Sequence, residues 1–265
     1  MSELPVLNTM WVEGPLSYVE QVCLKSALAC GHKVVLYTYF DVTGVPDGVE
    51  VRDGREVMGE DYLMKQKKRN SWSLCSNIFR YYLMRDEDAI WIDTDVYFQK
   101  PLNVNGGTHL FGWQKEELLN GAVLRIPPGS QLLDNLIDFV HHPSIVPPWL
   151  PKRKKLRYQI RPWLGLRPLT LAEYPWGVIG PRALTHFARE LDLTHYAVPQ
   201  DVFYPVPPKQ AKLLFDPDAD IAQYITDRTI AVHLWNEGIK ELKRAPAPKG
   251  SFIERICAAH CVPMN

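Results

Sequence analysis

The sequence predicts an α/β protein with a mixed, mostly parallel central sheet and a Rossmann-like, nucleotide-binding opening. Segments with strand composition alternate with segments of helical spacing from the start of the chain. An apolar run at residues 89–92 then leads directly into two carboxylates, Asp93 and Asp95. Because ligands of open α/β sheets bind outside the carboxyl ends of the strands, these two side chains mark the expected site.

Composition narrows the classes of function. The 265 residues balance 30 Lys and Arg against 30 Asp and Glu, so no overall field favours nucleic acid, and no such partner is expected. The length fits one domain, residues 1–265, with a basic insertion rich in Pro and Trp at about 143–175.

Cysteine usage and hydropathy predict a compartment. The five cysteines lack metal-ligand spacing and are expected to be reduced thiols. The first residues do not resemble a signal peptide, and no apolar stretch approaches the roughly 20 residues of a membrane helix. We therefore expect a cytoplasmic protein.

The first part of the chain predicts a βαβ unit. Residues 6–11 and 33–39 have strand composition, and the residues between them recur at helical spacing. Gly14 and Pro15 are expected to begin that helix and Gly31 to close it. Residues 41–60 are expected to form a loop with one short strand.

A second helix, over 71–84, places Asn77 and Arg80 on one face because they are three residues apart. A permanently charged guanidinium suits a diphosphate ligand, and the alternative is an ion pair with Asp86 or Asp88. Two strands at 108–113 and 121–126 follow, with Asn120 just before the second, and then a helix at 131–141.

Residues 143–175 are expected to form a long irregular loop. It interleaves cations at 152–155, 157, 161 and 167 with aromatic residues such as Trp163. It could cover the binding site of a second substrate and grip an anionic lipid-linked or phosphorylated ligand, contact an anionic membrane through residues 149–167, or be a solvated, Pro-stiffened loop. The membrane alternative would place the protein peripherally at the inner face of the membrane.

The last third contains a helix at 182–191 and a strand at 229–235. The helix follows Gly180 and Pro181, so its first amides could meet an oxygen-rich ligand. His233 lies near the end of the strand, and a lone histidine in an apolar run is usually a core residue.

The two carboxylates suit a hard cation. Asp93 and Asp95 offer oxygen ligands appropriate to Mg²⁺ or Mn²⁺ carrying a diphosphate. An Asp-x-Asp pair is also common in solvated loops, so the surrounding residues decide between the two interpretations.

Those surroundings resemble the DXD-containing GT-A glycosyltransferases. The likeness is to the family 32 group of α-1,4-galactosyl- and α-1,4-N-acetylglucosaminyltransferases, yeast initiating mannosyltransferases, and bacterial capsule and lipopolysaccharide enzymes. The family usually has Asp at the position of Asn77, and it has a Gly-Gly pair where residues 86–89 of this chain are Asp, Glu, Asp and Ala. These two departures bear on donor-sugar selectivity. The matching residues are Ser76, Asn77, Arg80, Trp91, Asp93, Thr94, Asp95, 120–122, 176–181, 203–205 and 231–236.

The resemblance implies a retaining hexosyltransferase with a GT-A fold, acting in bacterial polysaccharide biosynthesis. Its donor would be a nucleotide diphosphate sugar, with UDP expected in preference to GDP, and its acceptor a glycan or a lipid-linked molecule. Its cofactor would be Mn²⁺ (or Mg²⁺). The implied metal ligands are Asp93, Asp95 and His233, and the implied catalytic residues are Asp93, Asp95 and Arg80. The implied donor-binding residues are Trp11 (stacking on the base), Ser76, Asn77, Arg80, Asp93, Thr94, Asn120, Gly180 and Trp235.

Two other classes fit parts of the same pattern. Metal and carboxylates on an α/β sheet also serve a hydrolase of nucleotide sugars. A protein that binds glycans or nucleotides without catalysis could share the fold. For Trp11, packing in the core is an equal alternative to stacking on a base.

Overall fold

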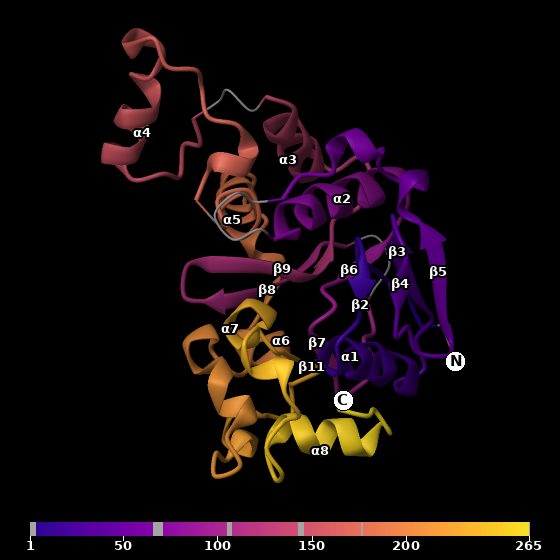
Figure 1. Ribbon diagram of the computed structural model, residues 1–265. Coiled ribbons are helices and arrows are strands. Elements are labelled where there is room, and N and C mark those ends of the chain that lie inside the picture. Colours follow the sequence, from indigo (N-terminus) through magenta and orange to yellow (C-terminus); the bar gives the residue numbers. More distant parts are fainter. Residues whose placement is uncertain (1–3, 66–70, 105–107, 143–145, 176, 265) are drawn as a thin grey trace.

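A computed structural model describes residues 4–65, 71–104, 108–142, 146–175 and 177–264. Its centre is a seven-stranded sheet in the order β10-β8-β9-β6-β1-β3-β5 (Figure 1). Of these seven strands β9 alone runs against the others, so the expected mixed, mostly parallel sheet is confirmed. The strands are β1 (Leu7–Met10), β3 (Val34–Thr38), β5 (Val49–Asp53), β6 (Ile90–Ile92), β8 (Leu110–Lys115), β9 (Leu118–Arg125) and β10 (Ala197–Val198).

Helices cover both faces of the sheet. In β3, Leu36 belongs to the core beneath α1 and α8, whereas Tyr37 belongs to the core beneath α2, α3 and α5. This alternation follows from the two-residue period of a strand, and apolar residues on both faces are typical of a buried parallel sheet. The helices are α1 (Tyr18–Ala29), α2 (Ser73–Asp86), α3 (Gln131–His141), α5 (Pro181–Glu190) and α8 (Phe252–Ala259).

Two small strand pairs lie outside the main sheet. β7 (Val96–Phe98) pairs antiparallel with β11 (Ala231–His233), with His233 opposite Val96. β2 (Gly14–Pro15) pairs parallel with β4 (Val42–Thr43). The first pair matters most for function, because it carries the late histidine to the segment that follows β6. The short helices α6 (Gln200–Phe203) and α7 (Asn236–Ile239) complete this side.

The start of the first helix differs from the sequence prediction. Gly14 and Pro15 form β2, and α1 begins only at Tyr18. Ser17 caps this helix, and the Glu20 carboxylate accepts a hydrogen bond from the Ser17 backbone N–H, which completes a capping box. This reciprocal cap satisfies two of the donors at a helix start, and Pro15 offers no such bonds. Asn120 differs too, since it lies inside β9 and not before it.

The insertion is more regular than the predicted loop. Residues 152–159 form α4 (Lys152–Gln159), and a 3-10 turn follows at Pro162–Leu164. Lys, Arg and Leu have high helix propensity, and no proline interrupts residues 152–161. Figure 1 shows that this segment projects from the body beside α3 and α5. Over the described residues, no helix has the length and apolar character that crossing a bilayer requires.

Candidate active site

Asp93 directly follows β6 at the carboxyl edge of the sheet. Its backbone N–H donates to Ala122 O at 2.7 Å, which continues the pairing of β6 with β9. Its Oδ1 accepts hydrogen bonds from Arg80 Nη2 at 2.9 Å and from Trp91 Nε1 at 2.7 Å. Among the described residues, none donates to Oδ2. One oxygen is therefore held in place while the other can serve a ligand.

Arg80 is a nearly buried anchor for Asp93. Its guanidinium donates to Ser76 O and Ser76 Oγ, each at 3.1 Å, and to Gly121 O. It also lies over the Trp91 ring, 4.7 Å from the centroid. With its side chain only 6% exposed, Arg80 acts first by orienting Asp93.

The alternative ion pairs of this arginine do not form. Asp86 pairs with Arg85, and Asp88 pairs with Arg125. Arg80 turns instead toward the sheet, because Asp93 lies at the end of the strand on which α2 packs.

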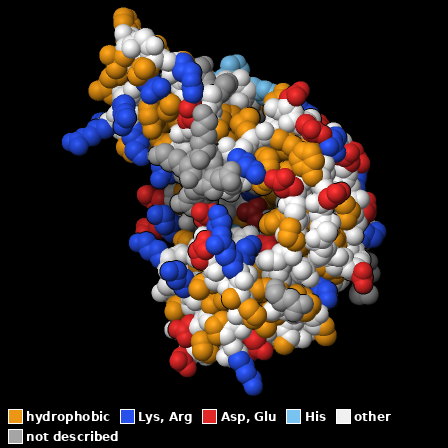
Figure 2. Space-filling view, in the orientation of Figure 1, with side chains coloured by type: hydrophobic (Ala, Val, Ile, Leu, Met, Phe, Trp, Pro, Cys, Tyr) orange, Lys and Arg blue, Asp and Glu red, His pale blue; other side chains and the backbone are white. Residues whose placement is uncertain are grey.

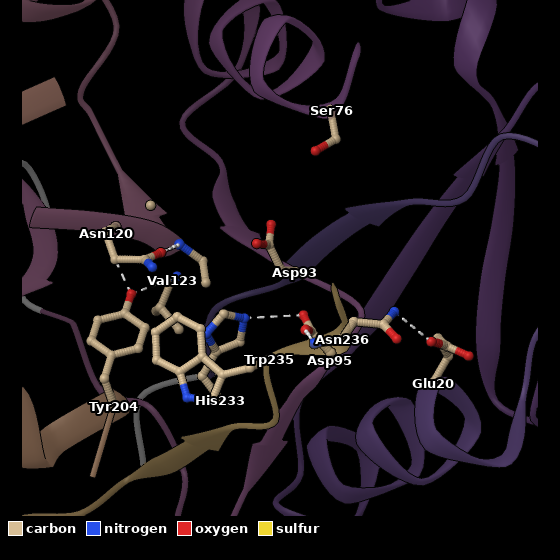
Figure 3. A network of polar contacts seen from close by, with 12 residues as sticks. Glu20, Ser76, Asp93, Asp95, Asn120, Val123, Tyr204, His233, Trp235 and Asn236 are labelled. Carbon is tan, nitrogen blue, oxygen red and sulfur yellow. Dashed lines mark hydrogen bonds and ion pairs between the residues drawn. The ribbon is translucent and has the colours of Figure 1, made fainter. Parts of the chain in front are cut away.

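Asp95 and His233 meet across the β7–β11 pair. His233 Nε2 lies 3.2 Å from Asp95 Oδ1, and the Asn236 backbone N–H donates to Asp95 Oδ2 at 2.6 Å. Leu234 N also donates to Asp95 O at 2.8 Å. Ligand atoms of Asp93, Asp95 and His233 all lie within 4.8 Å of one another. Figure 3 shows His233 joined to Asp95, with Asp93 between this pair and Ser76.

Each of these two buried groups favours the charged form of the other. Burial alone would raise the pKa of Asp95, but the adjacent His233 and the Asn236 N–H hold that pKa below its ordinary value. Burial would lower the pKa of His233, but the charge of Asp95, its hydrogen bond and the charge of Asp93 raise it. The negative charge that raises the pKa of His233 also attracts a cation.

The residues present fit a divalent metal. Two carboxylates and one imidazole form a donor set that Mn²⁺ accepts. His233 Nδ1 is buried and has no partner among the described residues, whereas Nε2 faces Asp95. The expectation that His233 joins the two aspartates is therefore consistent with the geometry.

Trp235 shapes the turn behind His233. Its backbone has φ 59°, in the left-handed region that bulky residues rarely adopt. This conformation lets both His233 and the Asn236 N–H reach Asp95. The Trp235 ring lies against His233, with centroids 4.1 Å apart, and its Nε1 donates to Val206 O at 2.7 Å. Trp235 is only 8% exposed, and its ring forms a wall beside His233.

A buried carboxylate behind the site was missed by sequence reasoning. Glu20, fully buried on α1, accepts from Asn236 Nδ2 at 2.7 Å and from Lys243 Nζ. Its other oxygen accepts from Ser17 N at 2.9 Å. Glu20 thus supports Asn236, whose backbone holds Asp95 (Figure 3). The Ser-x-x-Glu capping pattern at 17–20 was the available signal, but it predicts a helix start and not a site.

Asn77 and Gly180 lie against each other. Asn77 Nδ2 donates to Ser73 O at 2.8 Å. A Cβ on Gly180 would come within 2.7 Å of Asn77 Oδ1, so only glycine permits this approach. Gly180 caps the start of α5, which places two predicted donor-binding residues together. Trp176, in the same matching segment, lies outside the described residues.

The remaining predicted donor-binding residues are placed differently. Asn120 is 7% exposed. Its Nδ2 donates to Gln114 Oε1 at 2.9 Å, and its Oδ1 accepts from Ala122 N at 2.7 Å. Both polar atoms of the Asn120 amide are therefore hydrogen-bonded to residues of β8 and β9. Thr94 is half-buried in the turn between Asp93 and Asp95.

Trp11 is half-buried and lies near Lys243, whose ammonium contacts Glu20. It follows β1, is partly buried against the core beneath α1, and has a buried Nε1 with no partner among the described residues. Lys243 Nζ lies 5.9 Å from its ring centroid. Figure 2 shows a hollow near the middle of one face, with acidic side chains inside it and Lys and Arg side chains at its rim.

The fold is that of GT-A glycosyltransferase domains. The chain resembles the ligand-free glycosyltransferase domain from the YGT toxin at a TM-score of 0.51 and 9% identity, over 97% of this chain and 94% of that one. The UDP-bound form of that domain gives a TM-score of 0.48 at 10% identity over the same shares. PaToxG glycosyltransferase gives 0.44 at 12% identity, over 71% of this chain and 68% of that chain.

Residues 173–265 match the family described as the "Alpha 1,4-glycosyltransferase conserved region". The predicted resemblance is thereby confirmed for about the last third of the chain, which includes Gly180, His233 and Trp235. Among curated proteins, none matches the sequence significantly.

Proposed function

We propose that this protein is a metal-dependent, retaining glycosyltransferase that moves a hexose from a nucleotide diphosphate sugar to a glycan or glycolipid acceptor. The observation that carries the proposal is the convergence of Asp93, Asp95 and His233 within 4.8 Å at the carboxyl edge of the sheet. His233 lies in the segment that matches the α-1,4-glycosyltransferase conserved region, and Asp93 and Asp95 form the DXD pair.

The three ligands would hold Mn²⁺ or Mg²⁺, which supplies positive charge to the departing diphosphate when bound. Arg80 keeps Asp93 in position through its 2.9 Å contact. The Asn236 N–H does the same for Asp95 at 2.6 Å. Fixing both carboxylates in advance reduces the reorganisation needed during the reaction.

The donor is assigned to the space around these ligands. Ser76, Asn77, Thr94 and Gly180 would face the sugar, and Trp11 would stack on the base. Trp235 would close the wall behind His233, which it already contacts. Since its amide is engaged within the fold, Asn120 would support the strand beneath the sugar and not grip a hydroxyl. UDP is the proposed nucleotide, by the resemblance to α-1,4-glycosyltransferases.

Retention of configuration is proposed through displacement on one face of the sugar. The acceptor hydroxyl would attack the anomeric carbon as the bond to the diphosphate breaks, and the departing phosphate oxygen would take the acceptor proton. In this step the protein would position the acceptor hydroxyl against the anomeric carbon of the donor. A β-linked product from an α-linked donor would contradict this assignment.

A donor screen tests the proposal. Thermal unfolding is followed with UDP, GDP and their hexose conjugates, with and without Mn²⁺, and sugar release is measured in parallel. A ligand at 100 times its Kd should add about 2.7 kcal/mol of stability. We expect metal-dependent stabilisation that Asp95→Asn abolishes and that the exposed control Asp218→Asn retains.

The same screen separates the rival functions. Sugar release into water at a rate that acceptors do not increase would indicate a nucleotide-sugar hydrolase. Metal-dependent binding with neither release nor transfer would indicate a binding protein. No stabilisation by any nucleotide would overturn the proposed site.

A further inference from the structure

The arm, defined here as residues 151–168, ends in an exposed apolar tip. Trp163 is 91% exposed, and Leu164 and Leu156 are 65% and 60% exposed. Large apolar side chains gathered at one projecting end are unusual on a protein surface and mark interaction sites. Figure 2 shows hydrophobic side chains at the outer end of this projection.

The tip is held in a defined shape. Leu164 N donates to Ile160 O at 3.2 Å, and Leu166 N donates to Arg161 O at 3.0 Å. Gly165, at φ 69°, closes the turn in a conformation that favours glycine. Arg161 Nε also donates to Arg167 O at 3.1 Å. These bonds hold Trp163 and Leu164 outward, which an irregular solvated loop would not do.

The base of the arm is joined to the body. The rings of Tyr158 and Tyr174 meet edge to face, with centroids 5.7 Å apart. A cavity of about 240 Å³ lies beside them and is lined in part by Pro162 and Leu169. The base of the arm is therefore packed against the body while its tip is exposed.

The charge of the arm has one sign. Residues 151–168 contain seven Lys and Arg and no Asp or Glu. Arg167 pairs with Glu173 at 2.7 Å. The cations of α4 form no ion pair with any described residue; they are Lys152, Arg153, Lys154, Lys155 and Arg157. This charge complements an anionic partner.

We propose that the arm docks on an anionic lipid bilayer, with Trp163 and Leu164 in the interface and the cations of α4 against the headgroups. Lys and Arg beside an anionic surface are attracted to it, and tryptophan favours the boundary between headgroup and hydrocarbon. A nucleic acid would match the charge but would leave the apolar tip uncovered, and an acidic protein would need an apolar pocket as well as negative charge. This surface lies outside the proposed donor site, and docking does not depend on transferase activity.

Vesicle flotation with the full chain tests the proposal. Vesicles of phosphatidylcholine alone are compared with vesicles containing 30% phosphatidylglycerol, a composition of about one anionic lipid in three. We expect binding to the anionic vesicles and little to the neutral ones. The variant K152Q/R153Q/K154Q should weaken binding on the order of 100-fold, since each cation contributes about a factor of five.

A second variant separates lipid insertion from charge alone. W163A/L164A should also weaken binding, with all cations retained. Matched controls are K209Q/K212Q and F40A, which change exposed residues outside the arm. Since all substituted side chains are exposed, unchanged thermal unfolding is expected and is measured. Equal binding by W163A/L164A and wild type, or binding that ignores lipid charge, would overturn the proposal.

Discussion

The carboxylate of Asp93 is held by the guanidinium of Arg80, with Nη2 2.9 Å from Oδ1. The arginine side chain is 6% exposed and that of the aspartate 28%, so this ion pair is shielded on one side and open to ligand on the other. The ion pair therefore fixes the orientation of the Asp93 carboxylate.

Replacing Arg80 by methionine should destabilise the protein by about 3 kcal/mol. The substitution leaves Asp93 without its cation and removes the donor to Gly121 O. Urea unfolding measures the change. Arg228→Met is the control, because Arg228 is 65% exposed and its pair with Asp201 should contribute less than about 1 kcal/mol. Equal effects of the two substitutions would show that the Arg80 pair is no anchor.

Glu20→Gln should weaken both stability and metal binding. It leaves the ammonium of Lys243 without its buried partner and changes the support of Asn236. We expect a loss of about 3 kcal/mol and Mn²⁺ affinity about 10-fold to 100-fold lower, as for other groups that orient metal ligands.

Adding Lys243→Met should restore part of the stability lost in Glu20→Gln, because the unpaired charge is removed. Unfolding and calorimetric titration of both variants provide the measurements. Unaltered Mn²⁺ affinity in Glu20→Gln would disprove its connection to the metal site.

Mn²⁺ binding should tighten as pH rises. Asp95 raises the pKa of His233 above the ordinary histidine value, so the proton stabilises the metal-free folded state at low pH, and this stabilisation is lost as pH rises through the raised pKa. A metal ligand must be unprotonated, so affinity should rise about 10-fold per pH unit below that pKa.

Calorimetry from pH 6 to 9, in buffers of different ionisation enthalpy, measures both affinity and proton release. The expected result is release of about one proton per Mn²⁺ at the acidic end. The exposed variant His195→Gln should behave as wild type. An affinity that is flat across this range would mean that His233 is not a ligand.

Gly180→Ala should destabilise the protein by about 1–3 kcal/mol through the contact with Asn77. The new Cβ would lie within 2.7 Å of Asn77 Oδ1, and the amide is restrained by Ser73 O. In the Asn77→Ala background the same substitution should cost less, which a double-mutant cycle reveals. Gly59→Ala is the control, because nothing lies within 4 Å of its added Cβ. Additive effects at 77 and 180 would disprove the contact.

The elements that carry the site follow from local sequence. The apolar run before Asp93 forms β6, the run before His233 forms β11, and the predicted helix at 131–141 is α3. Each depends on periodicity or composition within a short window, which neighbouring residues determine. The residue types of the candidate metal site were predictable for the same reason, since two carboxylates follow β6 and an imidazole ends β11.

Tertiary structure alone decided which of these side chains meet. His233 reaches Asp95 because β11 pairs with β7 in one register, and a shift of one residue would turn His233 away. Arg80 contacts Asp93 and not Asp86, and Asn120 is engaged inside β9. Glu20 supports the site from a helix cap 216 residues before Asn236. Such contacts depend on how distant elements pack, which no local pattern encodes.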